Sequence, residues 1–157
     1  MKNVILLFFS LLLSGYSIAQ NKKNKKYTVS LSKQEWKKKL TPMQFYVLRE
    51  AGTERPNTSK FNGFKKKGTY VCVGCDTPLY TSERKYDSGS GWPSFDKAIE
   101  KNIETDTDHK IGYVRTELRC NECGGHLGHR FNDGPKNTTG IRDCINGVVL
   151  KFVPDEK

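Results

Sequence analysis

The first part of the chain to show a regular pattern carries apolar residues at helical spacing. Within Thr28–Gly52 they recur at intervals of three and four, which puts them on one face of a helix. They are Trp36, Leu40, Met43, Tyr46 and Val47. Pro42 interrupts the run because proline removes a helical hydrogen bond, and Thr41 before it is a suitable N-cap. We therefore predict two short helices, the first of them capped by Ser30 or Ser32.

From Gly68 onward the pattern becomes extended. Apolar and β-branched residues dominate four segments that we interpret as strands, residues 69–73, 78–82, 113–120 and 144–152. Three stretches rich in glycine and polar residues are interpreted as loops, residues 52–63, 87–95 and 129–140. The chain of 157 residues is long enough for one domain with its own core. The pattern predicts a mainly β fold with a short helical arm at its N-terminus.

Residues 1–19 have the pattern of a secretory signal peptide. Lys2 precedes an apolar run from Val4 to Leu13, and Ser17 and Ala19 are small residues just before the expected cleavage point. The run is shorter than the roughly 20 apolar residues that span a bilayer, which favours a cleaved signal over an uncleaved membrane anchor. We therefore expect an exported protein, periplasmic or secreted.

The net charge of +10 is concentrated near the N-terminus. Residues 1–39 hold nine lysines and a single acidic residue, Glu35, so the other 118 residues carry only +2. We interpret residues 20–30 as a basic linker. Because the charge is confined to this tail, we expect no nucleic-acid partner.

Five cysteines form two C-x-x-C pairs and one singleton. The pairs, Cys72/Cys75 and Cys120/Cys123, have the spacing that supplies four thiolates to one tetrahedral Zn²⁺, a closed structural site. Because 44 residues separate the pairs, such an ion would tie two distant strand ends together. In an exported protein, two disulfides are the alternative.

The fifth cysteine, Cys144, is either an inert buried residue or a nucleophile. We interpret residues 141–152 as one strand, in which Arg142, Cys144 and Asn146 share a face. On that face the guanidinium of Arg142 would lower the thiol pKa, and Asn146 would offer an amide donor. A surface Arg142 beside a core Cys144 is the alternative.

Further candidate groups lie upstream of this strand. His126, His129 and Asp133 suit acid–base chemistry or the binding of an oxygen atom, with metal ligands or ordinary loop residues as alternatives. Trp92 and Phe95 suit either core packing or the wall of a pocket for an apolar group.

The segments "GWPSF" and "CGGHLGHRFNDGPKNTTGIRDCIN", together with the two C-x-x-C pairs, resemble the B-type methionine-R-sulfoxide reductases. The resemblance extends from about Leu31 to Phe152 and includes "WKKKLTPMQFYVLREAGTERP". It implies a reductase domain over residues 31–157, with two antiparallel β-sheets, short N-terminal helices and one structural Zn²⁺ on the four paired cysteines.

The resemblance also implies a role for each candidate residue. Cys144 would be the nucleophile that reduces the R epimer of methionine sulfoxide in oxidised proteins or peptides, becoming a sulfenic acid. Trp92 would contact the terminal methyl group of the substrate, with Phe95 as a second substrate-binding residue. The groups that would bind and protonate the sulfoxide oxygen are His126, His129, Asp133, Arg142 and Asn146.

Two positions depart from the family pattern. Many members have a resolving cysteine where this chain has Ser90, so no thiol remains for an internal disulfide if the paired cysteines hold zinc. We therefore expect an external reductant, a thioredoxin-like protein or a small thiol. Asp143 stands where many members have an aromatic residue, and on the strand interpretation it faces away from Cys144.

Two other classes of protein compete with the reductase. An exported zinc-ribbon-like binding module would explain the C-x-x-C pairs and the charge, but not a lone thiol between Arg142 and Asn146. A secreted interaction domain stapled by two disulfides is the third reading. We expect the chain to be a monomer.

Overall fold

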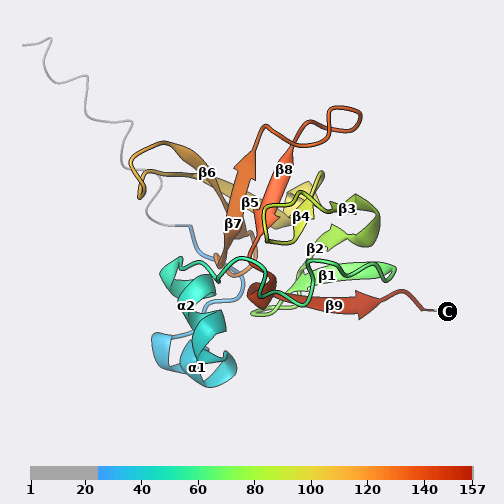
Figure 1. Ribbon diagram of the computed structural model, residues 1–157. Coiled ribbons are helices and arrows are strands. Elements are labelled where there is room, and N and C mark those ends of the chain that lie inside the picture. The colour runs from blue at the N-terminus through green and yellow to red at the C-terminus, as the bar shows by residue number, and fades with distance from the viewer. Residues whose placement is uncertain (1–24, 157) are drawn as a thin grey trace, which may run out of the picture.

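The computed structural model describes residues 25–156 and opens with two helices that lie at one end of a β fold (Figure 1). Helix α1 spans Lys33–Lys39 and helix α2 spans Pro42–Glu50. Ser32 and Thr41 each cap a helix, and in both caps the side chain three residues on bonds back to the cap's own N–H. The prediction of two short helices divided at Pro42 is confirmed.

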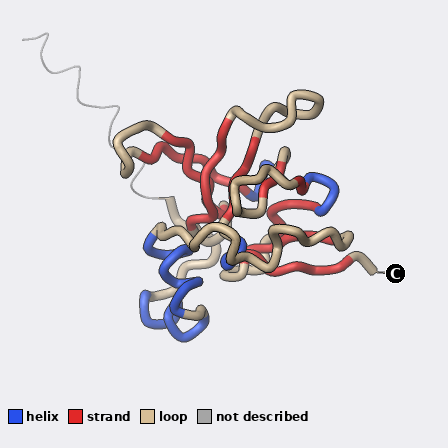
Figure 2. Tube along the Cα trace, viewed as in Figure 1, coloured by secondary structure: helices blue, strands red, loops and turns tan. Residues whose placement is uncertain are grey.

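Within the described residues, nine strands form two antiparallel sheets (Figure 2). The smaller sheet has the order β2-β1-β9, built from β1 (Gly68–Cys72), β2 (Pro78–Thr81) and β9 (Leu150–Pro154). The larger has the order β3-β4-β8-β7-β6-β5. Its strands are β3 (Lys85–Tyr86), β4 (Ser94–Phe95), β5 (Ile103–Asp108), β6 (Arg115–Cys120), β7 (His126–Phe131) and β8 (Arg142–Ile145). The predicted fold class is confirmed.

Aromatic rings join the two sheets. Tyr70 of β1 meets Phe95 of β4 edge to face, with ring centroids 5.1 Å apart, and Tyr80 of β2 stacks on the same Phe95 ring at 4.2 Å. All three side chains are fully buried. Their large apolar area makes this contact a main source of the packing between the sheets.

Helix α2 buries only part of the apolar face that the sequence predicted. Phe45, Val47 and Leu48 are buried, whereas Met43 and Tyr46 are 48% and 46% exposed. The methyl groups of Leu48 pack where a Cβ at Gly74 or Gly125 would stand, so the helix lies against both C-x-x-C turns.

The segment 144–152 is not one strand, contrary to the sequence prediction. Strand β8 ends at Ile145, a 3₁₀ turn covers Gly147–Val149, and β9 then enters the other sheet. The carboxylate of Glu54 causes this break, because it accepts the backbone N–H groups of Gly147 and Val148.

Two further differences concern loops and strands. Residues 129–131 belong to β7, although the glycine-rich composition of residues 129–140 indicated a loop throughout. Strand β5 was not predicted because its sequence, IETDTD, alternates polar residues with only one large apolar side chain.

The described end of the predicted basic linker is held against the domain. The hydroxyl of Tyr27 donates to Glu104 of β5 at 2.9 Å, and the N–H of Val29 donates to the carbonyl of Glu122 at 3.0 Å. The predicted signal peptide, residues 1–19, lies outside the described residues. Among the residues that are described, no helix has the length and apolar character to cross a bilayer.

Gly128 is expected to be indispensable for the pairing of β7 with β8. A Cβ there would stand 2.0 Å from the carbonyl oxygen of Cys144, which is backbone and has little freedom to move. We expect Gly128→Ala to lower the free energy of unfolding by about 1–3 kcal/mol in urea titrations. Gly63→Ala is the matched control, since nothing lies within 4 Å of a Cβ at Gly63. Equal stability of the two variants would contradict this account.

Candidate active site

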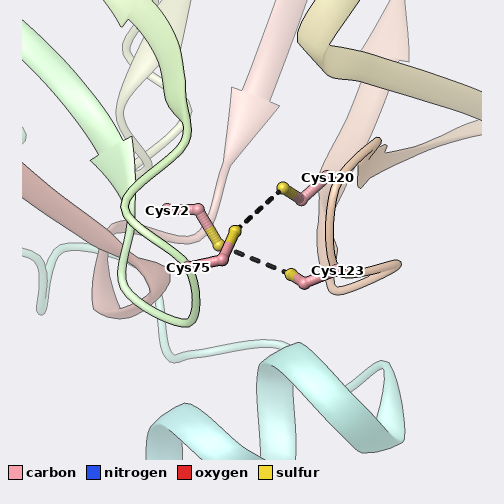
Figure 3. Close-up of side chains that lie close together, drawn as sticks. All are labelled: Cys72, Cys75, Cys120 and Cys123. Carbon is pink, nitrogen blue, oxygen red and sulfur yellow. Dashed lines mark hydrogen bonds between the residues drawn. The ribbon is translucent and has the colours of Figure 1, made fainter. Parts of the chain in front are cut away.

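The four paired cysteines gather between the ends of β1 and β6 (Figure 3). Their sulfur atoms all lie within 4.8 Å of one another, with Cys72–Cys123 at 3.8 Å and Cys75–Cys120 at 3.5 Å. Each contact joins one C-x-x-C turn to the other. The cluster therefore links two segments that are far apart in the sequence, as its spacing predicted.

These sulfur separations fit a metal centre. A tetrahedral ion with Zn–S bonds of about 2.3 Å requires sulfur atoms about 3.8 Å apart, whereas a disulfide requires about 2.05 Å. Cys72, Cys120 and Cys123 are buried, and Arg49 fixes the second turn by donating to the carbonyl of Cys123 at 2.7 Å. The donor set can hold one metal ion and is consistent with structural zinc.

Strand β8 brings Cys144 to the larger sheet between two polar neighbours. Its cross-strand partners are Ser94 on β4 and His129 on β7, so these three side chains share one face. Cys144 and His129 border a cavity of about 120 Å³. The cavity is lined by Thr53, Trp92, Arg115, Gly128, His129, Phe131, Cys144 and Asn146.

A bulge in β7 brings a second imidazole to this face. Leu118 of β6 pairs with Gly128 of β7, but the next residue of β6, Arg119, pairs with His126. Leu127 therefore has no partner on β6 and is the extra residue of the bulge. Residues three apart then point the same way, and the rings of His126 and His129 have centroids 5.3 Å apart.

Each imidazole is held by a carboxylate that the sequence analysis missed. His126 Nδ1 lies 2.6 Å from Glu117 Oε1, and His129 Nε2 lies 2.8 Å from Asp108 Oδ2. Arg115 also donates to Asp108. Both carboxylates come from the edge hairpin β5–β6, and only the register of that hairpin with β7 reveals them.

Burial of His129 favours a neutral ring. Burial lowers the pKa of His129 despite the carboxylate beside it. Burial alone would raise the pKa of Asp108. Hydrogen bonds from the backbone N–H of Lys110 and from the side chains of His129 and Arg115 outweigh burial, and they hold the pKa of Asp108 well below its usual range. Asp108 is therefore ionised and accepts Nε2–H, which leaves Nδ1 of His129 as the basic nitrogen.

Burial also governs the pKa of Cys144. It raises the thiol pKa, and the hydrogen bond with Ser90 and the charge of Arg142 only partly oppose this. Arg142 lowers the thiol pKa as expected, but it makes two hydrogen bonds with Asp133, at 2.8 and 2.9 Å, which share its charge. Cys144 in the free protein is accordingly a thiol at neutral pH, not the thiolate that the sequence suggested.

Asn146 and Trp92 are fixed by the loop at residues 52–63. The N–H of Glu54 donates to Asn146 Oδ1 at 2.9 Å, and Trp92 Nε1 donates to the carbonyl of Glu54 at 3.1 Å. Asn146 follows β8 instead of continuing its face, and its Nδ2 donates to the carbonyl of Leu127. Glu54 thus positions two walls of the cavity, a role that its place in a polar loop did not indicate.

Phe95 does not reach the cavity, contrary to the sequence prediction. It is fully buried on the opposite face of β4 and belongs to the aromatic contact between the sheets. Phe131 takes the position of second aromatic wall, with the guanidinium of Arg142 4.3 Å from its ring centroid.

Asp143 faces away from Cys144, as the alternation of the strand requires. It is fully buried and accepts two hydrogen bonds from Arg130, at 2.7 and 2.9 Å, and one from the hydroxyl of Tyr80 at 3.2 Å. The buried charge is therefore paired within the core and separated from the cavity by the sheet.

A larger hollow of about 490 Å³ lies beside α2, lined partly by Met43, Arg55 and Val148. It contains no thiol and no imidazole among its lining residues. The smaller cavity, which joins a thiol, an imidazole and two aromatic walls, is therefore the candidate active site.

The chain is similar to several known proteins over most of its length. The SelR domain matches residues 40–154. Peptide methionine sulfoxide reductase MsrB of Pseudomonas putida is 53% identical, covering 77% of this chain and 91% of that protein. The MsrB of Leptospira interrogans is 49% identical over 80% and 96%. Methionine-R-sulfoxide reductase B2, mitochondrial, of Rattus norvegicus is 50% identical over 83% and 79%.

The fold, the four-cysteine cluster and the similarity to these reductases together define the chain as an oxidoreductase. The chain belongs to the SelR domain family, that is, to the B-type peptide-methionine (R)-S-oxide reductases.

Proposed function

We propose that this chain reduces the R epimer of methionine sulfoxide in proteins or peptides, with Cys144 as the nucleophile. The observation that carries the proposal is the cavity in which the Cys144 thiol stands opposite the His129 ring and beside Trp92. A volume of about 120 Å³ suits the end of one side chain, so the substrate backbone remains outside. The preference for the R epimer rests on family membership alone.

The reaction begins with loss of the thiol proton. Because burial raises the pKa of Cys144, the sulfur needs a base, and the neutral His129 has one basic nitrogen. The sulfur then forms a bond to the sulfoxide sulfur of the substrate, whose methyl group lies between the Trp92 and Phe131 rings. The sulfoxide oxygen next bonds to the Cys144 sulfur while the sulfur–sulfur bond and the bond from oxygen to the substrate sulfur break, so that methionine leaves and the cysteine becomes a sulfenic acid.

The sulfoxide oxygen must be protonated while its bond to sulfur breaks. His126 is suited to this because Nε2 is buried and has no partner among the described residues, while Nδ1 is fixed by Glu117. When both nitrogens carry protons, Nε2–H is a donor without an acceptor inside the protein. Arg142, steadied by Asp133, adds positive charge near the same oxygen.

Regeneration of Cys144 requires a thiol from outside the chain. Ser90 Oγ lies 3.8 Å from the Cys144 sulfur, so the position from which a resolving cysteine would attack carries a hydroxyl. A thioredoxin-like protein or a small thiol attacks the sulfenic acid, which releases water and forms a mixed disulfide. A second thiol then restores Cys144.

The four-cysteine cluster holds one structural Zn²⁺ in this proposal, and the protein is exported by residues 1–19. Closed coordination by four sulfurs leaves no position for a substrate, which separates the metal from the chemistry. A zinc-ribbon-like binding module would leave the cavity at Cys144 without a purpose. Export is supported by the N-terminal sequence pattern alone.

Replacement of the nucleophile is expected to abolish catalysis and leave the metal in place. With dithiothreitol as reductant, Cys144→Ser should reduce neither separated epimer of a methionine sulfoxide peptide, whereas the natural chain reduces the R epimer. Elemental analysis should find the same zinc content in both proteins. Full activity in Cys144→Ser would refute the proposed function.

After a single turnover without reductant, Cys144 is expected to remain a sulfenic acid. Dimedone should label it, and mass spectrometry of the intact protein should show one adduct. We expect no disulfide between Cys144 and any paired cysteine, because all four are metal ligands. Such a disulfide would show that the reductant is internal.

Loss of one cluster cysteine is expected to cost metal and stability together. Cys72→Ser leaves three thiolates, and we expect zinc to be lost to a chelator and the melting temperature to fall by several degrees. Cys144→Ser serves as the matched control because it removes a thiol outside the cluster. An unchanged melting temperature in Cys72→Ser would contradict a structural role for the ion.

A further inference from the structure

Three serine hydroxyls form a chain that leads to the sulfur of Cys144. Ser90 Oγ lies 3.8 Å from Cys144 Sγ, Ser88 Oγ lies 2.8 Å from Ser90 Oγ, and Ser94 Oγ lies 2.7 Å from Ser88 Oγ. Ser94 is fully buried and is the cross-strand partner of Cys144 in β4. The chain of hydroxyls therefore runs from the Cys144 sulfur into the loop that holds Ser88 and Ser90, and it ends at Ser94 on the neighbouring strand β4.

The far end of the chain sets the direction of its hydrogen bonds. Ser94 Oγ also lies 3.2 Å from the carbonyl oxygen of Trp92, which only accepts. Each hydroxyl has one proton, so when Ser94 donates to Trp92, Ser88 donates to Ser94 and Ser90 donates to Ser88. The proton of Ser90 then points away from the sulfur, and the thiol of Cys144 donates to Ser90.

The same chain is complete in the opposite direction when the sulfur has lost its proton. Ser90 then donates to the thiolate, Ser88 to Ser90 and Ser94 to Ser88, and only the Trp92 carbonyl loses a donor. Ser88 accepts the backbone N–H of Ser90 at 3.3 Å in either arrangement, which holds the middle of the chain in place.

We propose that Ser88, Ser90 and Ser94 form a reversible hydrogen-bond chain that accepts from the Cys144 thiol at rest and donates to the sulfur once its proton has left. Ser90 touches the nucleophile, and Ser88 and Ser94 are positioning residues that act through it. The inference rests on the proposed function and deepens it. It gives the position of the absent resolving cysteine a task in the control of thiol ionisation.

Other ionisable groups face Cys144 and stay unchanged in the test. Arg142 lies on the same strand with Asp133 as its partner, and Tyr86 on β3 is the cross-strand partner of Ser94. His129 on β7 and Arg115 on β6 line the same cavity as Cys144. Their influence on the thiol is common to every variant compared below.

The test is the pH profile of Cys144 alkylation by iodoacetamide, measured on the zinc-loaded, reduced, full-length protein without substrate. Ser88→Ala removes the acceptor that holds the Ser90 proton, so that proton becomes available to the sulfur. The midpoint should move to lower pH, with about a threefold to tenfold rise in the thiolate fraction at neutral pH. Ser90→Ala removes the donor itself, so the midpoint should move to higher pH by a similar factor.

Shifts of the alkylation midpoint in opposite directions in Ser88→Ala and Ser90→Ala would identify a directed hydrogen-bond chain. If the substitutions only loosened the loop, both midpoints would move in the same direction. Ser88→Thr, which keeps the hydroxyl, should restore the natural midpoint. Ser82→Ala is the matched control, since its hydroxyl accepts the N–H of Gly68 outside the chain and no shift is expected.

Shifts of the same sign in Ser88→Ala and Ser90→Ala, or no shift in either, would overturn the proposal. The proposal would also be overturned if the alkylation midpoint of Ser88→Thr were the same as that of Ser88→Ala. These outcomes are separate from failure of the proposed function, which shows as retained activity in Cys144→Ser. Thermal melting of each variant checks that the protein compared is folded.

Discussion

The register of β8 between β4 and β7 is the constraint on which the active site depends. It sets Cys144 opposite Ser94 on one side and His129 on the other. Since side chains alternate along a strand, the same register sends Asp143 into the core, where Arg130 and Tyr80 satisfy it. A slip of one residue would bury the nucleophile and leave a carboxylate in the cavity. The close approach of Gly128 to the backbone of β8 and the buried Asp143–Arg130 pair both oppose such a slip.

The four-cysteine cluster and the cavity are separate sites, and the cluster has a structural role. The cluster joins the turn after β1 in one sheet to the turn after β6 in the other, and α2 packs on both turns through Leu48. The cluster holds the two turns together, and its four sulfur atoms contact one another. The cavity thiol lies apart from it, on β8, which pairs with β4 on one side and β7 on the other.

Burial in the cavity has two consequences for the chemistry. It keeps Cys144 protonated at rest and keeps His129 neutral, which together make an acid–base pair of a thiol and an imidazole. The carboxylates that hold the imidazoles come from the edge hairpin, where ionised groups are also stabilised by Arg115 and Arg119. In the proposed mechanism the Cys144 thiol gives its proton to His129, and the proposed hydroxyl chain pairs with either state of the sulfur through Ser90.

Local signals in the sequence were enough to predict the helices, the four-cysteine cluster and a lone thiol outside it, because caps, C-x-x-C spacing and an unpaired cysteine are all visible without the fold. The sequence also named half of the residues that line the cavity, whereas the predicted His126, Asp133, Arg142 and Phe95 are not among its lining residues. Only the tertiary structure showed that Phe95 belongs to the core, that Asn146 lies beyond the end of its strand, and that Glu117, Asp108 and Glu54 hold the site. Those facts depend on strand register, a bulge at Leu127 and loop packing across long sequence distances, which no local pattern encodes.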